Sequence, residues 1–300
     1  MMTILLNGMS AFYGVFIMID KQLLEQLIDS ALKEDLGIRG DVTTDAIFAD
    51  NDQAEAVIRS KCNGVISGLY LIKPLFTKLD KTIDVKINAA DGDKMQPGTI
   101  LCTLKGSVKT ILAGERLALN FLQRLSGVAT MTAKYTDAIA HTHTRLLDTR
   151  KTTPMLRYLE KLAVVHGGGC NHRFGLFDMI LIKDTHVKRA GGVGNALKKA
   201  IAFRGNDTGL KIEAEVQSVA ELEEALVFTP DRIMLDNMSI TDMKRCVEIV
   251  KQSGKKVELE ASGNITVATI ASVAETGVDF ISCGAITHSA PSVDIHLLIV

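Results

Sequence analysis

The spacing of apolar and polar positions changes near residue 144. Beyond it, apolar runs of strand length alternate with segments of helical period such as 220–227 and 243–252. The expected strands are 145–148, 179–183, 211–216, 232–236, 257–261 and 279–282. Repeated strand–helix units favour parallel strands joined by right-handed crossovers. No GxGxxG sequence follows the first strand, so a six-unit α/β barrel fits better than a dinucleotide-binding sheet.

An amphipathic helix is expected near the start of the chain, with Asp20 as its N-cap and Gly37 at its end. Its apolar stripe comprises Leu23, Leu24, Leu27, Ile28, Ala31 and Leu32. The preceding segment 1–19 is apolar, but small and polar residues interrupt it and it contains no Lys or Arg. These features disfavour a membrane span and a secretory signal. We interpret the segment as an extension upstream of a natural start at Met18.

Residues 54–104 hold short alternating runs with turn signals between them, which predict a small antiparallel sheet. The helical period returns over 108–140, and we expect it to be broken at Ser126-Gly127. The turn at 91–98 resembles the hairpin of biotinyl or lipoyl carrier domains. Lys94 lacks the flanking motif of a modified lysine, so a plain hairpin is favoured.

Composition excludes several classes of function. The 300 residues are 47% hydrophobic and 23% charged, which is ordinary for a globular protein with ample core. The net charge of −1 argues against nucleic acid or a membrane surface as a partner, because both favour broad basic faces. The five cysteines form no CxxC pair, so reduced thiols and a cytoplasmic location are expected.

Two of the expected strands end abruptly in charged residues. Asp148 and two cations follow the first strand, and Lys183 ends the second. In a parallel sheet such strand ends open into a common site. The strand–helix–strand unit brings five cationic residues to this edge: Arg150, Lys151, His172, Arg173 and Lys183. This group predicts a pocket for a strongly anionic small molecule.

The later strands end in acids and small residues. Glu215 and Asp236 are expected at the same edge, where carboxylates suit Mg²⁺ or a developing cation; the alternative is an ion pair with a neighbouring lysine or arginine. The last two strands end in Ser262-Gly-Asn264 and Cys283-Gly-Ala285. Small residues let backbone N–H groups approach an anion, and the final loops of such barrels frequently bind phosphate.

The sequence resembles the quinolinate phosphoribosyltransferase family, also called nicotinate-nucleotide pyrophosphorylase (carboxylating). The matching segments are Glu34-Asp-Leu-Gly37, Gly40-Asp-Val-Thr-Thr44, Glu115-Arg-Leu-Ala-Leu-Asn-Phe-Leu122, Leu125-Ser-Gly-Val-Ala-Thr130, Asp148-Thr-Arg-Lys-Thr-Thr-Pro154, Gly167-Gly-Gly-Cys-Asn-His-Arg173, Leu181-Ile-Lys-Asp184, Leu235-Asp-Asn237, Ala261-Ser-Gly-Asn264 and Gly284-Ala-Ile-Thr-His-Ser289. Met155 stands where the family often has Gly, and Thr185 where it often has Asn.

The resemblance implies a domain plan. After the extension at 1–19, it places an N-terminal α+β open-sandwich domain at 20–127 and an incomplete α/β barrel at 128–288. A C-terminal segment, 289–300, would return to the N-terminal domain. The resemblance also implies a homodimer with shared active sites.

The resemblance further implies conversion of quinolinate and phosphoribosyl pyrophosphate to nicotinate mononucleotide, CO₂ and pyrophosphate in NAD biosynthesis, with Mg²⁺ and no organic cofactor. Carried over, Lys151, Glu215 and Asp236 are catalytic, and the two acids also face Mg²⁺. The substrate-binding set is Arg116 (from the partner subunit), Thr149, Arg150, Lys151, His172, Arg173, Lys183, Glu215, Asp236, Ser262, Gly263, Asn264, Ser282, Cys283 and Gly284. Within it, Arg116, Arg150, His172, Arg173 and Lys183 would bind quinolinate.

Three alternatives remain open. A paralogue from molybdenum-transport operons shares the fold but alters the cation motifs, which are intact here at 148–151 and 171–173. A Schiff-base aldolase would use Lys183 as its nucleophile. A carrier or interaction protein would be modified at Lys94.

Overall fold

The computed structural model describes residues 21–300, so the interpretations of the extension at 1–19, of Met18 and of Asp20 lie outside the described residues. The described chain forms two compact units. The first comprises 21–131, 155–168 and 290–300, and the second comprises 132–154 and 169–289.

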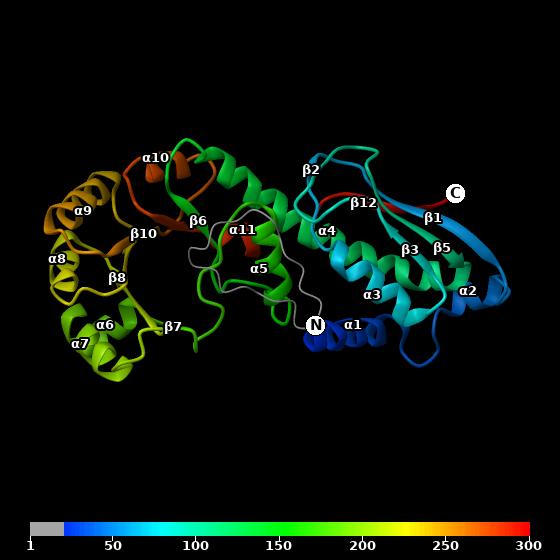
Figure 1. Cartoon of the computed structure of the whole chain (residues 1–300), viewed down its shortest axis with the longest axis horizontal. Helices are drawn as coiled ribbons and strands as arrows, with labels where there is room; N and C mark the ends of the chain where they lie inside the picture. The colour runs from blue at the N-terminus through cyan, green and yellow to red at the C-terminus, as the bar shows by residue number, and fades with distance from the viewer. Residues whose placement is uncertain (1–20) are drawn as a thin grey trace. The chain divides into compact units, whose positions relative to one another are not determined.

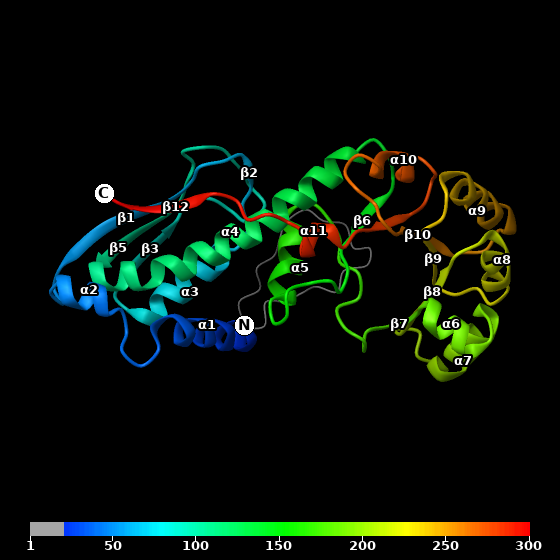
Figure 2. The ribbon, with the colours of Figure 1, turned by 180° about the vertical axis from the view of Figure 1, so that it is seen from behind.

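The first unit contains a four-stranded antiparallel sheet with strand order β12-β1-β5-β3 (Figures 1 and 2). Its strands are β1 (Gln53–Ser60), β3 (Asp84–Ile87), β5 (Ile100–Ser107) and β12 (Ile295–Ile299), and a separate pair joins β2 (Gly64–Val65) to β4 (Lys94–Met95). Its helices are α1 (Lys21–Leu36), α2 (Val42–Ile47), α3 (Leu69–Leu79), most of α4 (Val108–Ala138) and α5 (Arg157–His166). Because β12 pairs with β1, the C-terminal segment belongs to this unit.

The expected break at Ser126-Gly127 is wrong, because α4 runs unbroken through both residues. Ser126 faces inward, and its hydroxyl accepts a hydrogen bond from the Ser67 amide at 3.0 Å. A Cβ on Gly127 would lie 2.2 Å from the Pro291 carbonyl oxygen. The glycine therefore permits a close approach of the C-terminal segment, and neither residue ends the helix.

Two other helices differ from expectation. Helix α3 was not anticipated among the short alternating runs, and Pro74 within it obscures its helical period. A proline suits the first position of a helix, so Pro154 predicts a helix that begins there. Helix α5 begins instead at Arg157, because Met155 has a φ of +67°, in the left-handed region that favours glycine.

Helix α5 also falls in the first unit, although the domain plan placed it in the barrel. Its buried Glu160 is paired with Arg124 of α4, and its last residue, His166, contacts the Ser67 hydroxyl at 2.8 Å. The division of α4 between the units falls after residue 131, against the expected 127.

The second unit contains a six-stranded parallel sheet with strand order β6-β11-β10-β9-β8-β7. Its strands are β6 (Arg145–Leu147), β7 (Met179–Ile182), β8 (Lys211–Val216), β9 (Arg232–Asp236), β10 (Glu258–Ser262) and β11 (Phe280–Ser282). The five strands β7 to β11 are paired in chain order, and β6 pairs with the far side of β11, whereas β6 and β7 are not paired. The sheet is therefore an α/β barrel that lacks one seam, as the fold class predicted.

The strands of the second unit are joined by helices that pack outside them (Figure 2). These helices are α6 (Asp184–Ala190), α7 (Val193–Arg204), α8 (Val219–Val227), α9 (Ile240–Ser253), α10 (Ile270–Ala274) and α11 (Ala285–His288). All six predicted strands are confirmed, with ends that differ by at most one residue. The apolar interior of these strands, for example Ile233 and Leu235, forms the core of the unit.

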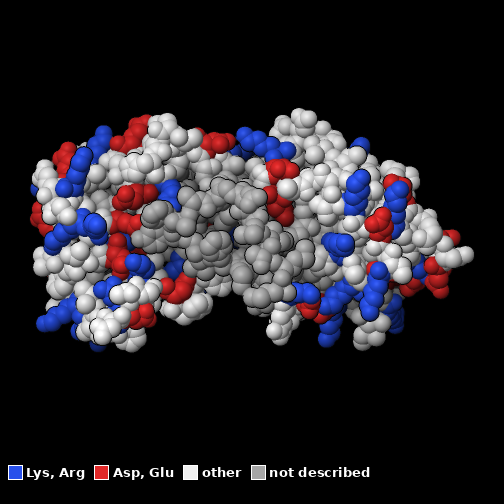
Figure 3. Space-filling model, in the orientation of Figure 1, with Lys and Arg blue, Asp and Glu red and all other residues white. Residues whose placement is uncertain are grey.

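Within residues 21–300, no helix is both long and apolar enough to cross a membrane. On the face shown in Figure 3, basic and acidic side chains of the described residues are interspersed.

Candidate active site

The C-terminal ends of four neighbouring strands of the second unit are aligned. In the parallel register, Asp236 of β9 is opposite Ser262 of β10, and Ser262 is opposite Ser282 of β11. Ser282 is in turn opposite Leu147 of β6, immediately before Asp148. This aligned row, the carboxyl edge of the sheet, carries the predicted acid, both small-residue loops and the start of the predicted cation segment.

The segment after β6 presents Thr149, Arg150 and Lys151. The Thr149 hydroxyl accepts a hydrogen bond from the Lys151 amide at 3.0 Å and closes a tight turn. The Lys151 carbonyl accepts a hydrogen bond from the Thr287 hydroxyl at 2.8 Å. A Cβ on Gly284 would lie 2.8 Å from Lys151 Cδ, so the lysine stem crosses directly over this glycine. Lys151 is therefore held against the loop after β11.

Buried Asp148 organises the second cation segment. One of its carboxylate oxygens accepts the His172 amide at 2.8 Å, and the other accepts the Asn171 side-chain amide at 2.7 Å. The Arg173 guanidinium donates to the Met179 carbonyl at 3.0 Å. Burial and then the positive charge of Arg150 lower the pKa of Arg173, although an arginine remains protonated. The two guanidinium groups are thus close enough to repel one another, and an anion bound beside them would relieve this repulsion.

Lys183, which directly follows β7, forms an ion pair with Glu215 of β8, with Nζ 2.6 Å from Oε1. The other oxygen of Glu215 accepts the Asp184 amide at 3.2 Å. The lysine side chain is 46% exposed and the glutamate only 9%. Glu215 therefore does form the ion pair that was the alternative for a strand-end acid. The pair joins a residue predicted to bind quinolinate, Lys183, to a residue predicted to bind phosphoribosyl pyrophosphate, Glu215.

The loop after β10 interlocks with the end of β9. Asn237 and Asn264 both have positive φ, +55° and +51°, and their side chains are joined by a hydrogen bond of 3.2 Å. A Cβ on Gly263, whose φ is +106°, would lie 2.2 Å from Asn237 Oδ1. Only glycine fits at this position, so the backbone of the loop is held in one conformation.

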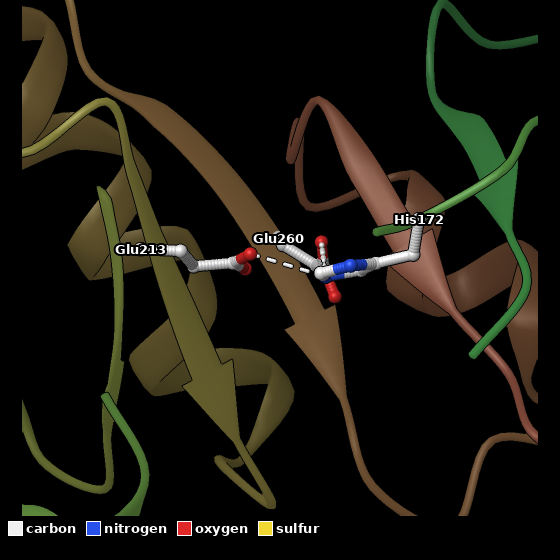
Figure 4. Close-up of side chains that lie close together, drawn as sticks. All are labelled: His172, Glu213 and Glu260. Carbon is white, nitrogen blue, oxygen red and sulfur yellow. Dashed lines mark ion pairs between the residues drawn. The ribbon is translucent and has the colours of Figure 1, made fainter. Parts of the chain in front are cut away.

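Four charged or titratable side chains lie beneath the carboxyl edge, and we call them the buried quartet: His172, Glu213, Arg232 and Glu260. His172 Nε2 lies 3.0 Å from Glu213 Oε2 and 3.5 Å from Glu260 Oε2, between strands β8 and β10 (Figure 4). The Arg232 guanidinium donates to Glu260 at 2.8 Å and stacks 4.0 Å from the centre of the Phe280 ring. Among the described residues, neither oxygen of Glu213 accepts an aligned hydrogen bond, so its contact with His172 is primarily electrostatic.

The carboxylates of the buried quartet differ in their protonation. Burial and then the negative charge of Glu213 raise the pKa of Glu260 to about 7. Burial opposes ionisation of Glu213 as well, but His172 and Arg232 hold its pKa below the ordinary value. The pKa values of Glu213 and Glu260 are therefore shifted in opposite directions, although both residues are glutamates. Because the two carboxyl groups interact, protonation of one depends on the other.

Arg116 lies on α4 in the first unit and is exposed. All other predicted site residues belong to the second unit.

Sequence reasoning placed Asp148 at a strand end that opens into the site but assigned no role to it, nor to Glu213, Arg232 or Glu260. One pattern could have found three of them: an ionisable residue at an inward position within an otherwise apolar strand is exceptional in a barrel interior. Asp148 differs because it stands at the strand end, where its role depends on a loop more than twenty residues later.

Comparison with known proteins gives one consistent family. The family models described as "Quinolinate phosphoribosyl transferase, N-terminal domain" and "C-terminal domain" match residues 41–126 and 128–298. The quinolinate phosphoribosyltransferase [decarboxylating] 2a, mitochondrial, of Nicotiana tabacum is 40% identical over 289 residues, covering 92% of this chain and 82% of that protein.

Solved structures agree. The crystal structure of NadC from Streptococcus pyogenes matches with a TM-score of 0.87 at 39% identity, covering 92% of this chain and 97% of that one. The nicotinate-nucleotide pyrophosphorylase from Francisella tularensis matches with a TM-score of 0.87 at 39% identity, covering 93% and 96%. With both family models matched and these identities spanning nearly all of its length, the chain belongs to the quinolinate phosphoribosyltransferase family.

Proposed function

We propose that the chain transfers the phosphoribosyl group of phosphoribosyl pyrophosphate to the ring nitrogen of quinolinate, giving nicotinate mononucleotide, CO₂ and pyrophosphate in de novo NAD biosynthesis. One observation carries the proposal. At a single sheet edge, cations suited to carboxylates adjoin small-residue loops suited to phosphate, in aligned register. A dicarboxylate and a phosphoribosyl donor are the two substrates that this combination fits.

The cation segments account for quinolinate. Arg150 and Arg173 offer planar forks that pair with carboxylates, and Lys183 offers a point charge. Because Lys183 is already paired with Glu215, a bound carboxylate would share an existing charge. The cations would hold the 2-carboxylate in place until it leaves as CO₂ and a proton replaces it on the ring carbon.

The other half of the carboxyl edge accounts for the phosphoribosyl donor. The loops 262–264 and 282–284 would bind the 5′-phosphate through backbone N–H groups. Lys151, which crosses Gly284, supports this assignment. Glu215 and Asp236 would stabilise positive charge that develops on the ribosyl carbon as pyrophosphate departs.

The donor set at this edge also fits Mg²⁺. Magnesium prefers carboxylate oxygens, keeps several waters and commonly shares substrate phosphates. Asp236 has a carboxylate oxygen whose contact with the Gln217 amide is long, at 3.4 Å, and Glu215 is the next acid along the edge. These two residues would hold the ion, which would neutralise charge on the pyrophosphate.

The rival functions have less support. A Schiff-base enzyme needs a neutral lysine, whereas Lys183 is paired with a carboxylate at 2.6 Å. A carrier domain presents its lysine at the tip of a turn, whereas Lys94 lies within β4 and pairs with β2.

Product analysis tests the proposal. Quinolinate, nicotinate and nicotinamide are offered in parallel with phosphoribosyl pyrophosphate, with and without Mg²⁺. We expect nicotinate mononucleotide and pyrophosphate from quinolinate alone, because a monocarboxylate leaves buried cations unpaired. Comparable turnover of nicotinate would refute the assignment.

We also infer a homodimer in which Arg116 completes the partner's site. An exposed arginine beside the buried Leu117 and Ala118 of α4, in a segment that matches the family, supports this inference. Arg116→Ala and Lys183→Ala, each expected to retain only a small fraction of wild-type activity alone, are co-expressed. If Arg116 acts in trans, about half the dimers are mixed and about a quarter of all sites recover. Background activity in tag-purified mixed dimers would exclude sharing.

A cytoplasmic location is part of the same proposal. All five cysteines lie within the described residues and are free, and three of them are buried. Reduced thiols suit a reducing compartment. Subcellular fractionation checks this location.

A further inference from the structure

The proposed reaction assigns roles to His172 and Arg173 but none to three charged side chains behind them. Glu213 and Glu260 are 0% exposed and Arg232 is 5% exposed. Burial of charge at this depth is costly unless each charge is compensated. Because apolar side chains would fill this part of the barrel interior at lower cost, we look for a role that requires the charges of these residues.

The hydrogen bonding of His172 shows what that is. The Arg173 backbone N–H lies 2.7 Å from His172 Nδ1 and donates to it. An amide N–H can only donate, so Nδ1 must keep its lone pair and the ring proton must lie on Nε2. Nε2 faces the two carboxylates, at 3.0 Å from Glu213 and 3.5 Å from Glu260. The carboxylates of Glu213 and Glu260 therefore stabilise the Nε2–H tautomer, which is the one that the Arg173 backbone N–H requires.

We propose that Glu213, Glu260 and Arg232 are positioning residues of the carboxylate-binding segment: they fix the His172 ring in its Nε2–H tautomer and, through Nδ1, fix the backbone at Arg173. This inference rests on the proposed function. Asp148 anchors the same segment from the other side through the His172 amide at 2.8 Å. With both anchors in place, the backbone at Arg173 is fixed, and so is the point from which its side chain extends.

The charges of the buried quartet support this role. Burial lowers the pKa of His172, but Glu260 and Glu213 outweigh burial and raise it. A second proton on the ring would nevertheless fall on Nδ1, where it would oppose the Arg173 N–H. If Glu260 holds the additional proton, as its raised pKa favours, Glu213 and Arg232 balance one another. In that state the quartet is neutral overall and the imidazole remains neutral.

The donor set also resembles a metal site, since His172, Glu213 and Glu260 offer ligand atoms within 4.8 Å of one another. The position of Arg232 argues against this use. Its guanidinium donates at 2.8 Å to Glu260 Oε2, the same oxygen that faces His172. A dication there would be repelled by a buried guanidinium and would have to displace it.

The test compares Glu213→Gln with Glu258→Gln in the full-length protein. Glu258 is a matched control, because it stands two residues before Glu260 on β10 and also pairs with Arg232, at 3.3 Å, but is partly exposed, and the pKa of His172 is raised by Glu260 and Glu213. For Glu213→Gln we expect the KM for quinolinate to rise about tenfold or more, because small misplacements of binding groups are costly. The KM for phosphoribosyl pyrophosphate should change by less than about twofold, since uniform binding of that substrate is retained. Glu258→Gln should match the wild type in both.

A spectroscopic readout does not depend on activity. In the wild type, the ¹⁵N spectrum of labelled histidine should show His172 protonated at Nε2 and not at Nδ1, with the signals assigned by their loss in His172→Gln. Glu213→Gln should give mixed tautomers, and Glu258→Gln should not. If Glu213→Gln does not fold, Glu260→Gln replaces it, with the same expectations for quinolinate and for the tautomer.

Three results would overturn the proposal. They are a proton on Nδ1 in the wild type, a folded Glu213→Gln protein with unchanged KM for quinolinate, and one equivalent of bound zinc that Glu213→Gln releases. If the wild type fails to convert quinolinate, the proposed function is wrong, whereas the histidine spectrum still decides the tautomer.

Discussion

The two units each bury a cluster of charges, but the clusters are built differently. In the first unit, two nitrogens of Arg124 donate to one oxygen of Glu160 at 3.0 and 2.7 Å, and the third donates to the Ala290 carbonyl at 2.8 Å. In the buried quartet, neither oxygen of Glu213 accepts an aligned hydrogen bond among the described residues. The first cluster closes a contact between segments of one unit, and the second contacts the segment that the proposed function assigns to quinolinate binding. Complete pairing marks an architectural pair, and incomplete pairing marks a group held for function.

Arg232→Met should give a large loss of stability, because it removes the guanidinium that compensates the buried Glu213 and Glu260. We expect the free energy of unfolding to fall by about 3–5 kcal/mol. Urea titration measures it. Arg145→Met is the matched control, since Arg145 also lies over the Phe280 ring, 4.8 Å from its centre, but is only half-buried. Equal losses in both variants would mean that stacking, and not charge compensation, explains Arg232.

Lys183→Ala should affect activity far more than folding. It removes a charge-assisted contact worth roughly 1.5–3 kcal/mol, about a 10- to 150-fold loss in kcat/KM for quinolinate. Lys211→Ala is the control, because Lys211 also pairs with a carboxylate, at 2.9 Å, and is 38% exposed against 46% for Lys183. Lys211 starts β8, at the opposite end of the strand from the carboxyl edge. A comparable loss in Lys211→Ala would show that removing any ion pair of this sheet reduces activity, whatever its position.

The pH dependence of stability separates the two clusters further. The pKa of Glu260 is raised from 4.5 to about 7, so the folded state binds more protons than the unfolded state between these values. Stability from this group is complete below pH 4.5 and is lost as pH rises through about 7. Glu260→Gln cannot ionise, so its Tm should rise relative to the wild type across this window. A constant difference in Tm would contradict the raised pKa.

Replacing the whole pair in the first unit should have the smallest effect. Arg124→Met alone removes the guanidinium that faces the buried Glu160 and should cost about 3–5 kcal/mol, whereas Arg124→Met with Glu160→Leu should recover most of that loss. Quinolinate turnover per folded molecule should equal that of the wild type. Reduced turnover in a stable double variant would mean that the pair has more than an architectural role.

Local patterns in the sequence determined the second unit closely. Apolar runs gave all six parallel strands within one residue, because strand and helix periods are local properties. The same patterns placed Asp236, Ser262 and Ser282 at strand ends, and parallel pairing then puts strand ends at one edge whatever the side chains are.

Only the tertiary structure decided how distant residues meet. As a local pattern, Ser126-Gly127 predicts the end of a helix. Their contacts with Ser67 and Pro291 show instead that these residues allow close packing. Likewise, α5 lies between two barrel strands in the chain but packs with the first unit, because its buried Glu160 pairs with Arg124. The buried quartet gathers four residues from three strands and a loop. Sequence spacing carries no information about such meetings, since burial, pairing and protonation depend on neighbours that only the folded chain supplies.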